Sequence, residues 1–344
     1  MNSRKIMTGL LSSTAITLAL GAMNVAQAAP CSSPYVVGDV FASTGAGTVS
    51  VFTPTGAAVC TLNDTTGATF TTGSGFDAAG NFYVTNFSGS TISQFNNSGT
   101  LLSANYMNSG AHGQGLNESI VNVSVGPFAG NSFSGGASGA VINEFNTATG
   151  AFVHSFSVAG GNGTGGTDWV DFISPTTVIY DGEGTVIKQF NLATNTQLTD
   201  FAAAGFAGSS HLFALRVIPT GADAGDVLIA NSINALLLNS SGAVIKTYTL
   251  PGDAGGDFSL NLDPNGTDFW TGDFNSGNVW EVNIATGAID EQWNVGARDF
   301  YGLSVFGEIT SSGGGGGGSV PEPASLALFG AGLVALGFAR RRRT

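Results

Sequence analysis

Between the two ends of the chain, short apolar runs alternate with turns rich in Gly, Asn, Asp and Ser. The segment from Gly75 to Asn86 shows the arrangement best, because two apolar runs flank a turn at Asp77–Gly80. Further short runs follow at Thr91–Phe95 and Gly99–Leu102. Runs of strand length bounded by such turns predict β-hairpins, since Gly and Asp favour the backbone conformations of tight turns. This segment therefore predicts one unit of four strands.

The third strand of this unit recurs along the chain as a recognisable pair of residues. Successive pairs lie 43, 50, 45, 48 and 44 residues apart: Val51-Phe52, Gln94-Phe95, Glu144-Phe145, Gln189-Phe190, Leu237-Leu238 and Glu281-Val282. The turn after each pair contains a residue that tolerates a positive φ angle: Gly56, Gly99, Gly150, Asn195, Gly242 and Gly287. Six units of roughly 46 residues predict an all-β fold, a six-bladed β-propeller.

The two ends of the predicted propeller complement each other. The first unit has only three strands, around Tyr35–Ser43, Thr48–Phe52 and Ala57–Leu62, whereas the last has a surplus strand at Phe300–Phe306. If the surplus strand becomes the innermost strand of the first unit, it completes that unit and removes strand edges that would invite aggregation. We therefore expect strand closure between the ends of a propeller spanning residues 29–310. A sandwich or a solenoid would not need this closure.

The N-terminal 28 residues have the features of a secretory signal peptide. Arg4 and Lys5 precede an apolar run from Ile6 to Val25, and Ala26-Gln27-Ala28 forms an Ala-x-Ala cleavage site. Segments of this kind are removed by signal peptidase and do not belong to the fold. Export across the inner membrane is therefore expected.

The C-terminus combines a Gly-rich linker (residues 311–319), a Pro-Glu-Pro sequence, an apolar run and a basic cluster. Pro321, Glu322 and Pro323 precede about 16 apolar residues, close to the lower limit for spanning a bilayer. Arginines directly after such a run stay in the cytoplasm: Arg340, Arg341, Arg342 and Arg343. Two prolines prevent the helix from extending upstream. An ordinary C-terminal membrane anchor is the alternative, but it does not require Pro-Glu-Pro.

This order of features in residues 320–344 resembles the PEP-CTERM sorting tail of Gram-negative exopolysaccharide producers. The resemblance implies that an exosortase is a partner, recognises the tail, and releases or transfers the body after a transient stage of membrane insertion. It also implies that the protein ends at the cell surface or in the extracellular matrix.

The cysteine content predicts a disulfide, and the charge balance excludes one class of partner. Cys31 and Cys60 are the only cysteines; in an oxidising compartment we expect them to form a disulfide, although two free thiols are the alternative. Without the two end segments, the body has 22 acidic residues against four basic ones. Such a surface repels phosphate backbones, so nucleic acid is excluded as a partner.

A second resemblance concerns the blades. Gly80-Asn81-Phe82-Tyr83-Val84-Thr85-Asn86 is similar to the blade signature of NHL-repeat and SMP-30/gluconolactonase-like propellers. Those lactonases hold a metal in the central channel, but this chain has Thr72 where they carry a ligand Asp. Their early Glu has no counterpart either, because the first glutamate of the body is Glu118. No catalytic or metal-binding residue is therefore carried over.

Other polar residues are candidates for a ligand site in the channel. Innermost strands begin near the central channel of a propeller, and these residues lie near such starts: Asp168, His211, Asp257, Arg298 and Asp299. His112 lies on a Gly-rich loop that has the same potential, whereas His154 is expected on an outer strand. A structural role in turns is the alternative. Asp263–Asp268 resembles a calcium loop but lies where the repeat requires a turn and lacks a following Glu.

The sequence thus favours a secreted, exosortase-processed surface or matrix protein without catalytic activity or cofactor, with exopolysaccharide or other envelope components as partners. A weak site for a divalent cation such as calcium is left open. The alternative is a metal-dependent propeller hydrolase or lyase acting in the periplasm or outside the cell.

Overall fold

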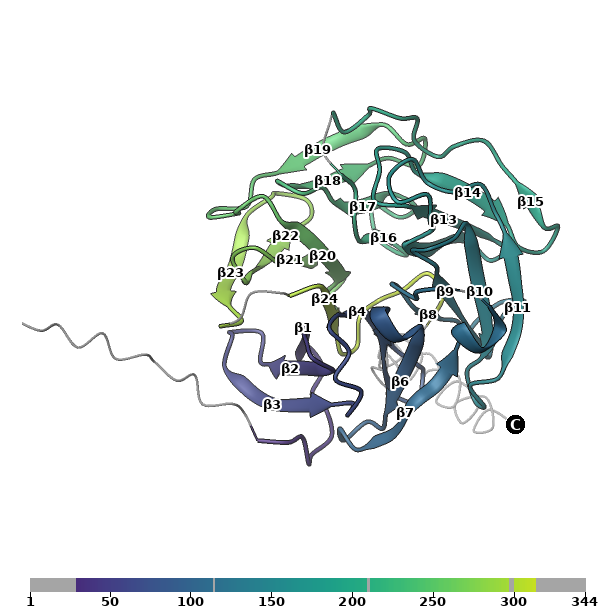
Figure 1. The fold of residues 1–344 in the computed structure, drawn as a ribbon. Coiled ribbons are helices and arrows are strands. Elements are labelled where there is room, and N and C mark those ends of the chain that lie inside the picture. The colour runs from purple at the N-terminus through teal and green to yellow at the C-terminus, as the bar shows by residue number, and fades with distance from the viewer. Residues whose placement is uncertain (1–28, 114, 209–210, 297–299, 314–344) are drawn as a thin grey trace, which may run out of the picture.

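The structure is a computed structural model that describes residues 29–113, 115–208, 211–296 and 300–313. Its 24 strands form six four-stranded antiparallel sheets arranged in a ring (Figure 1). The predicted six-bladed propeller is therefore confirmed. The six expected third-strand pairs all lie in the third strand of their sheet, counted outward from the centre.

We number the blades along the chain and give their strands from the centre outward. Blade 1 contains β24 (Gly302–Val305), β1 (Val40–Gly45), β2 (Thr48–Phe52) and β3 (Ala58–Asn63). Blade 2 contains β4 (Thr71–Phe76), β5 (Phe82–Asn86), β6 (Thr91–Phe95) and β7 (Leu101–Asn108). Blade 3 contains β8 (Val121–Asn122), β9 (Asn131–Gly135), β10 (Val141–Asn146) and β11 (Phe152–Ser157).

The other three blades follow the same order. Blade 4 contains β12 (Trp169–Ser174), β13 (Thr177–Asp181), β14 (Lys188–Asn191) and β15 (Thr196–Gln197). Blade 5 contains β16 (Leu215–Val217), β17 (Val227–Ala230), β18 (Ala235–Leu238) and β19 (Val244–Tyr248). Blade 6 contains β20 (Asp257–Leu262), β21 (Asp268–Asp273), β22 (Asn278–Asn283) and β23 (Ile289–Asn294). Two short 3-10 helices, η1 (Phe87–Gly89) and η2 (Gly110–His112), lie in connections.

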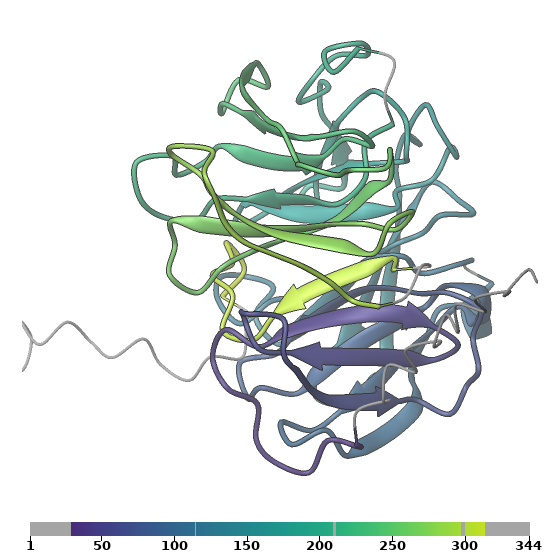
Figure 2. The ribbon, with the colours of Figure 1, turned by 90° about the vertical axis from the view of Figure 1, so that its left-hand side faces the viewer.

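The two ends of the propeller meet in blade 1, as expected. β24 pairs with β1 from Val40↔Val305 to Ser43↔Gly302, and Figure 2 shows the two strands side by side. A disulfide joins Cys31 to Cys60 on β3 of the same blade. The closing strand β24 pairs at the inner edge of this sheet, and the disulfide ties the N-terminal segment to its outer edge.

The turn after the third strand has a tertiary role that its sequence does not show. Gly56, Gly99, Gly150, Gly242 and Gly287 all have positive φ, as does Asn195. At Gly150 and Gly242 an added Cβ would also collide with backbone of the preceding blade, at Tyr106 and Phe201 respectively. These two glycines therefore serve both the turn and the close approach of neighbouring blades.

The hydrophobic core lies between adjacent blades. Inner and second strands are buried on both faces, as in β20 and β21, whereas the outer strand β23 alternates between half-buried and exposed positions. One cluster between blades 6 and 1 packs Trp270 and Val279 against Val40 and Phe52. The inner strands therefore have neighbours on both faces, whereas β23 has one face open to solvent.

The innermost strands define two faces of the ring. We call the face at which they begin the upper face and the face at which they end the lower face. After β24, residues 307–313 cross the lower face to blades 3 and 4, where the Ser311 hydroxyl donates to the Phe172 carbonyl. The Ser124 backbone N–H donates to the Ser312 carbonyl, and Val123 forms a β-bridge with Gly313. The expected linker began at Ser311, but its first three residues are part of the packed body.

No described helix is long and apolar enough to cross a membrane. The predicted signal peptide (1–28) and the sorting segment, including Pro321, Glu322, Pro323 and Arg340–Arg343, lie outside the described residues.

Candidate functional site

The candidates predicted for the channel do not form one site among the residues that the structure describes. Asp168 lies just before β12 in blade 4, and Asp257 is the first residue of β20 in blade 6; both are fully buried. His211 is exposed just before blade 5, and its ring stacks at 6.5 Å from that of Phe213. No hydrogen bond joins these three residues. Arg298 and Asp299 lie outside the described residues.

Asp168 belongs to a buried acidic cluster at the upper end of the channel with Glu118, Asp181 and Glu183. Burial, followed by the charge of Asp168, raises the pKa of Glu118 well above its usual value. Burial also raises the pKa of Asp168, while hydrogen bonds from Glu118 and the Thr164 hydroxyl oppose the rise. Because burial raises both pKa values, these two acids bind protons more readily than exposed carboxyl groups do.

The pKa values of the other two acids in this cluster are raised as well. Burial raises the pKa of Asp181 well above its usual value, and it raises that of Glu183 to about 7. Asp168 Oδ1 and Asp181 Oδ2 are buried without a hydrogen-bond partner. Within the described ranges, no group of three or more His, Cys, Asp or Glu side chains is placed to hold a metal ion.

Asp257 has a different environment. Its Oδ1 accepts a hydrogen bond of 2.5 Å from the Thr271 hydroxyl, and its backbone pairs with Ser232. Burial raises its pKa well above the usual value. These contacts are those of a residue that fastens β20 to β21, which was the structural alternative for this group of candidates.

The remaining candidates are on the periphery. The expectation that His112 points toward the channel is wrong, because its ring stacks at 4.1 Å on Phe152 of the outer strand β11. His154 lies on that strand and is exposed, as expected.

Thr72, which replaces the ligand Asp of the lactonases, shares a 2.6 Å hydrogen bond with the Thr85 hydroxyl. Asp263 accepts from the Asn265 N–H and the Trp270 indole, which identifies its loop as a turn.

Sequence reasoning missed a second buried polar group, near the lower end of the channel. Arg216 of β16 is 5% exposed; its Nε donates to Asn261 Oδ1 at 2.8 Å and its Nη1 donates to the Leu215 carbonyl. Its charge lowers the pKa of two nearby buried acids, Asp171 and Glu308, although burial outweighs it in both. Asp171 also accepts the N–H of Val217. Residues from three blades and the crossing segment therefore fill this end of the channel.

Glu308 makes stability depend on pH. Burial raises its pKa to about 8, so the folded state keeps a proton that the unfolded state loses near pH 4.5. The stabilisation of the folded state by this proton is complete below about pH 4.5 and is lost as pH rises toward 8. We expect Glu308→Gln to match the wild-type melting temperature at pH 4.5 and to exceed it at pH 8. Thermal unfolding across this range measures the difference.

Glu291→Gln, on the outer strand β23, is the control for this prediction. It should retain the wild-type decline in melting temperature between pH 4.5 and 8. The assignment to Glu308 would be contradicted if both variants declined as steeply as the wild type.

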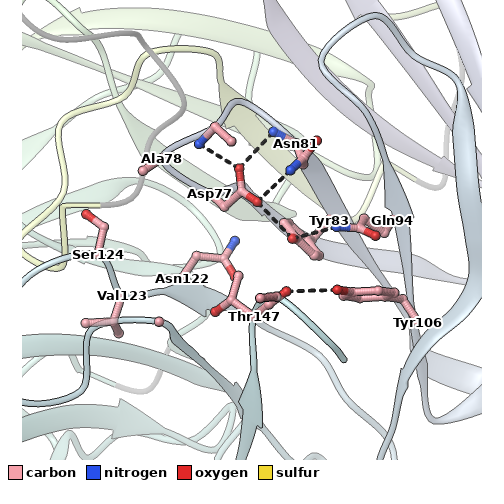
Figure 3. Close-up of a pocket in the computed structure, with 13 residues that line it drawn as sticks. Asp77, Ala78, Asn81, Tyr83, Gln94, Tyr106, Asn122, Val123, Ser124 and Thr147 are labelled. Atoms are coloured by element: carbon pink, nitrogen blue, oxygen red, sulfur yellow. Dashed lines mark hydrogen bonds between the residues drawn. The ribbon is translucent and has the colours of Figure 1, made fainter. Parts of the chain in front are cut away.

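A cleft of about 450 Å³ opens on the lower face between blades 2 and 3 (Figure 3). Its lining comes from the β4–β5 turn, the end of β8 and the turn after β10. The residues that contribute side chains with polar groups are Asp77, Asn81, Tyr83, Gln94, Tyr106, Asn122, Ser124 and Thr147. Neither Lys nor Arg is among the lining residues. The cleft thus presents phenol, amide and hydroxyl groups around one carboxylate.

Hydrogen bonds fix the wall of this cleft. Asp77 accepts from the backbone N–H of Ala79 and Asn81 and, at 2.9 Å, from the Tyr83 hydroxyl. The Tyr106 hydroxyl donates to the Thr147 carbonyl at 3.0 Å and so links blade 2 to blade 3. The two tyrosine rings lie 6.0 Å apart. This wall is rigid, because its polar atoms already hold one another in place.

One polar group of the cleft is unused. Asn122 is 5% exposed; its Oδ1 accepts from the Ser132 hydroxyl, but its amide nitrogen has no hydrogen-bond partner. Figure 3 shows its side chain between Asp77 and Thr147. A buried donor without a partner is costly, and a ligand oxygen in the cleft would satisfy it once a small movement of its neighbours uncovers the nitrogen.

Comparison with known proteins identifies the tail. Residues 319–343 match the family model of the PEP-CTERM protein-sorting motif. No curated protein matches the chain. The motif implies exosortase recognition, export and membrane-associated sorting in a Gram-negative bacterium, so the predicted sorting tail is confirmed. The likeness to NHL and SMP-30 blades stays a prediction.

Proposed function

We propose that this exported propeller is a non-catalytic binding protein that holds a neutral stretch of exopolysaccharide in the cleft between blades 2 and 3. It acts at the cell surface or in the extracellular matrix after its tail is removed. The observation that carries the proposal is the unpartnered amide nitrogen of Asn122 beside a cleft lined by two tyrosines.

The lining suits a sugar chain for chemical reasons. Amide and hydroxyl groups both donate to and accept from sugar hydroxyls. The half-buried ring of Tyr106 offers an apolar face for the C–H face of a sugar ring, while its hydroxyl is held by Thr147. A few fixed polar groups in a concave site are the usual source of ligand specificity.

Charge determines which sugar chains fit. The body carries a large excess of acidic residues, and burial followed by the charge of Asp77 raises the pKa of Tyr106, which keeps its hydroxyl neutral. An acidic polymer would be repelled, and the cleft has no cation to hold it. Binding should accordingly depend little on salt, because neutral contacts are not screened.

The proposal predicts a specific effect of Ala148→Arg. Ala148 is exposed at the rim of the cleft, so a large side chain there should obstruct the site without disturbing the core. We expect polymer binding to weaken about tenfold or more, which corresponds to ~1.4 kcal/mol. The measurement is co-sedimentation of the mature protein with polymer isolated from the producing bacterium, at low and high salt.

The chain supplies a matched control. Asn146-Thr147-Ala148-Thr149-Gly150 in blade 3 corresponds to Asn283-Ile284-Ala285-Thr286-Gly287 in blade 6. Ala285 is exposed on the equivalent turn and lies outside the cleft. Ala285→Arg should bind as the wild type does. Equal binding by the two variants, or no polymer binding by the wild type, would refute the proposed function.

The acidic cluster near the upper channel end favours the second candidate, a metal-dependent hydrolase or lyase. Its unpartnered Asp168 Oδ1 and Asp181 Oδ2 are acceptors for a cation after rearrangement. Because burial and the charge of Asp168 raise the pKa of Glu118 and so favour its protonated form, metal binding there would release protons. Calorimetric titration of the mature protein with CaCl₂ in two buffers of different ionisation enthalpy measures this release. Tight binding that Glu118→Gln abolishes, together with loss of a polymer-cleaving activity, would favour the enzyme.

A further inference from the structure

We propose that the lower face, with the cleft between blades 2 and 3, is turned toward the membrane while the tail is attached. Removal of the tail then exposes this face to large molecules. The orientation follows from where the chain leaves the body. Its consequence, that processing makes the polymer site accessible, rests on the proposed function.

The exit point of the tail lies on the lower face near the ring axis. Gly313 forms a β-bridge with Val123, directly after the innermost strand β8, and the Ser124 hydroxyl donates to the Gly313 carbonyl at 2.6 Å. Ser124 also lines the cleft. The same residue therefore fixes the start of the tail and forms part of the candidate binding site.

The length of the linker limits how the body can sit. Pro321 follows Gly313 by eight residues, so the linker spans at most about 29 Å. A body of about 280 residues has a radius of gyration near 19 Å, hence a width of roughly 48 Å. For the upper face to lie toward the membrane, the linker would have to extend from the ring axis to the outer rim of the propeller and then along the full height of that rim. That path is longer than the maximum span of the linker.

Two exposed valines lie along the crossing segment. Val37 and Val125 are 57% and 55% exposed. Val37 lies beside Gly307, and Val125 beside Gly313, at the two ends of the crossing segment. Exposed valines at this position are compatible with a face that lies near a bilayer before processing, because placing apolar side chains there costs little free energy.

Cysteine labelling tests the orientation. Ala148→Cys reports on the rim of the cleft, Val125→Cys on the surface beside the exit point, and Ile233→Cys on the turn between β17 and β18 of the upper face. Ile233 is 58% exposed, close to the 55% of Val125, and is the matched control. Cys31 and Cys60 are bonded to each other and do not react.

Each variant is compared as the full chain in vesicles of phosphatidylethanolamine and phosphatidylglycerol and as the processed protein. A maleimide carrying a large polyethylene glycol is the probe, and a small maleimide controls for thiol reactivity. We expect the large probe to label Ala148→Cys and Val125→Cys more slowly, by roughly an order of magnitude, in the vesicle-bound chain. Ile233→Cys should react equally in both forms.

The outcomes separate the two proposals. Equal labelling of all three variants in both forms, or selective protection of Ile233→Cys, overturns the orientation. If the labelling pattern holds but the processed protein does not bind the polymer, the orientation stands and the proposed function fails. Binding by the vesicle-bound chain that equals binding by the processed protein overturns the link between processing and access.

Discussion

Arg216→Met is expected to lower the free energy of unfolding by about 3–5 kcal/mol, the range for breaking a buried charge interaction. The substitution keeps much of the side-chain volume but removes the hydrogen bonds to Asn261 and the Leu215 carbonyl. It also removes the cation whose charge partly offsets the rise in pKa that burial causes in Asp171 and Glu308. Chemical denaturation of the mature protein at pH 7 measures the loss.

The loss should be smaller at pH 5 than at pH 7. At lower pH the two acids are more fully protonated, and a neutral carboxyl needs no cation nearby. Lys188→Met is the control, because Lys188 bonds Asp200 at 3.2 Å on the surface and such exposed pairs contribute about 0–1 kcal/mol. If Arg216→Met cost no more than Lys188→Met, the role assigned to Arg216 would be wrong.

The double variant Cys31→Ala/Cys60→Ala is expected to lose about 3–4 kcal/mol of stability. The disulfide closes a loop with a sequence separation of 29 residues. In the chain-entropy model, a cross-link of this length stabilises a protein by about 3.6 kcal/mol, because it restricts the unfolded chain. Thermal and denaturant unfolding of the mature protein measure the change.

Reduction provides an independent check of the same bond. A reducing agent should lower the melting temperature of the wild type toward that of the double variant and leave the double variant unchanged. If reduction destabilised both proteins equally, it would be acting somewhere other than this disulfide.

The number of blades and their closure were predictable because both are local in sequence. Each third strand with its turn lies within about ten residues, so the six copies are visible without any tertiary information. The surplus strand at the end of the body likewise matched the missing strand at its start, and β24 pairs with β1. Strand ends were less accurate: the first strand was expected from Tyr35, whereas β1 begins at Val40.

The candidate sites were much less predictable, because their members come from different blades. Asp168 was recognised from its position before an inner strand, but its partner Glu118 was noted only as a departure from the lactonase pattern. Asp181 is the last residue of β13, and Asp273 has the same position at the end of β21 in blade 6; each accepts the backbone N–H of the residue two positions on. Nothing in the sequence shows which of these strand-end carboxylates meets an acid from a neighbouring blade.

The amino-acid sequence by itself determined the architecture and the sorting tail: six repeated four-stranded units that close on themselves, followed by the sorting motif. Repeats and targeting segments are continuous in sequence, so they can be recognised there. Only the tertiary structure decided that Arg216 meets Asp171 and Glu308, that Asn122 faces a cleft, and that the tail leaves beside it. Those contacts depend on how neighbouring sheets pack around one axis, and that packing brings together residues separated by whole blades.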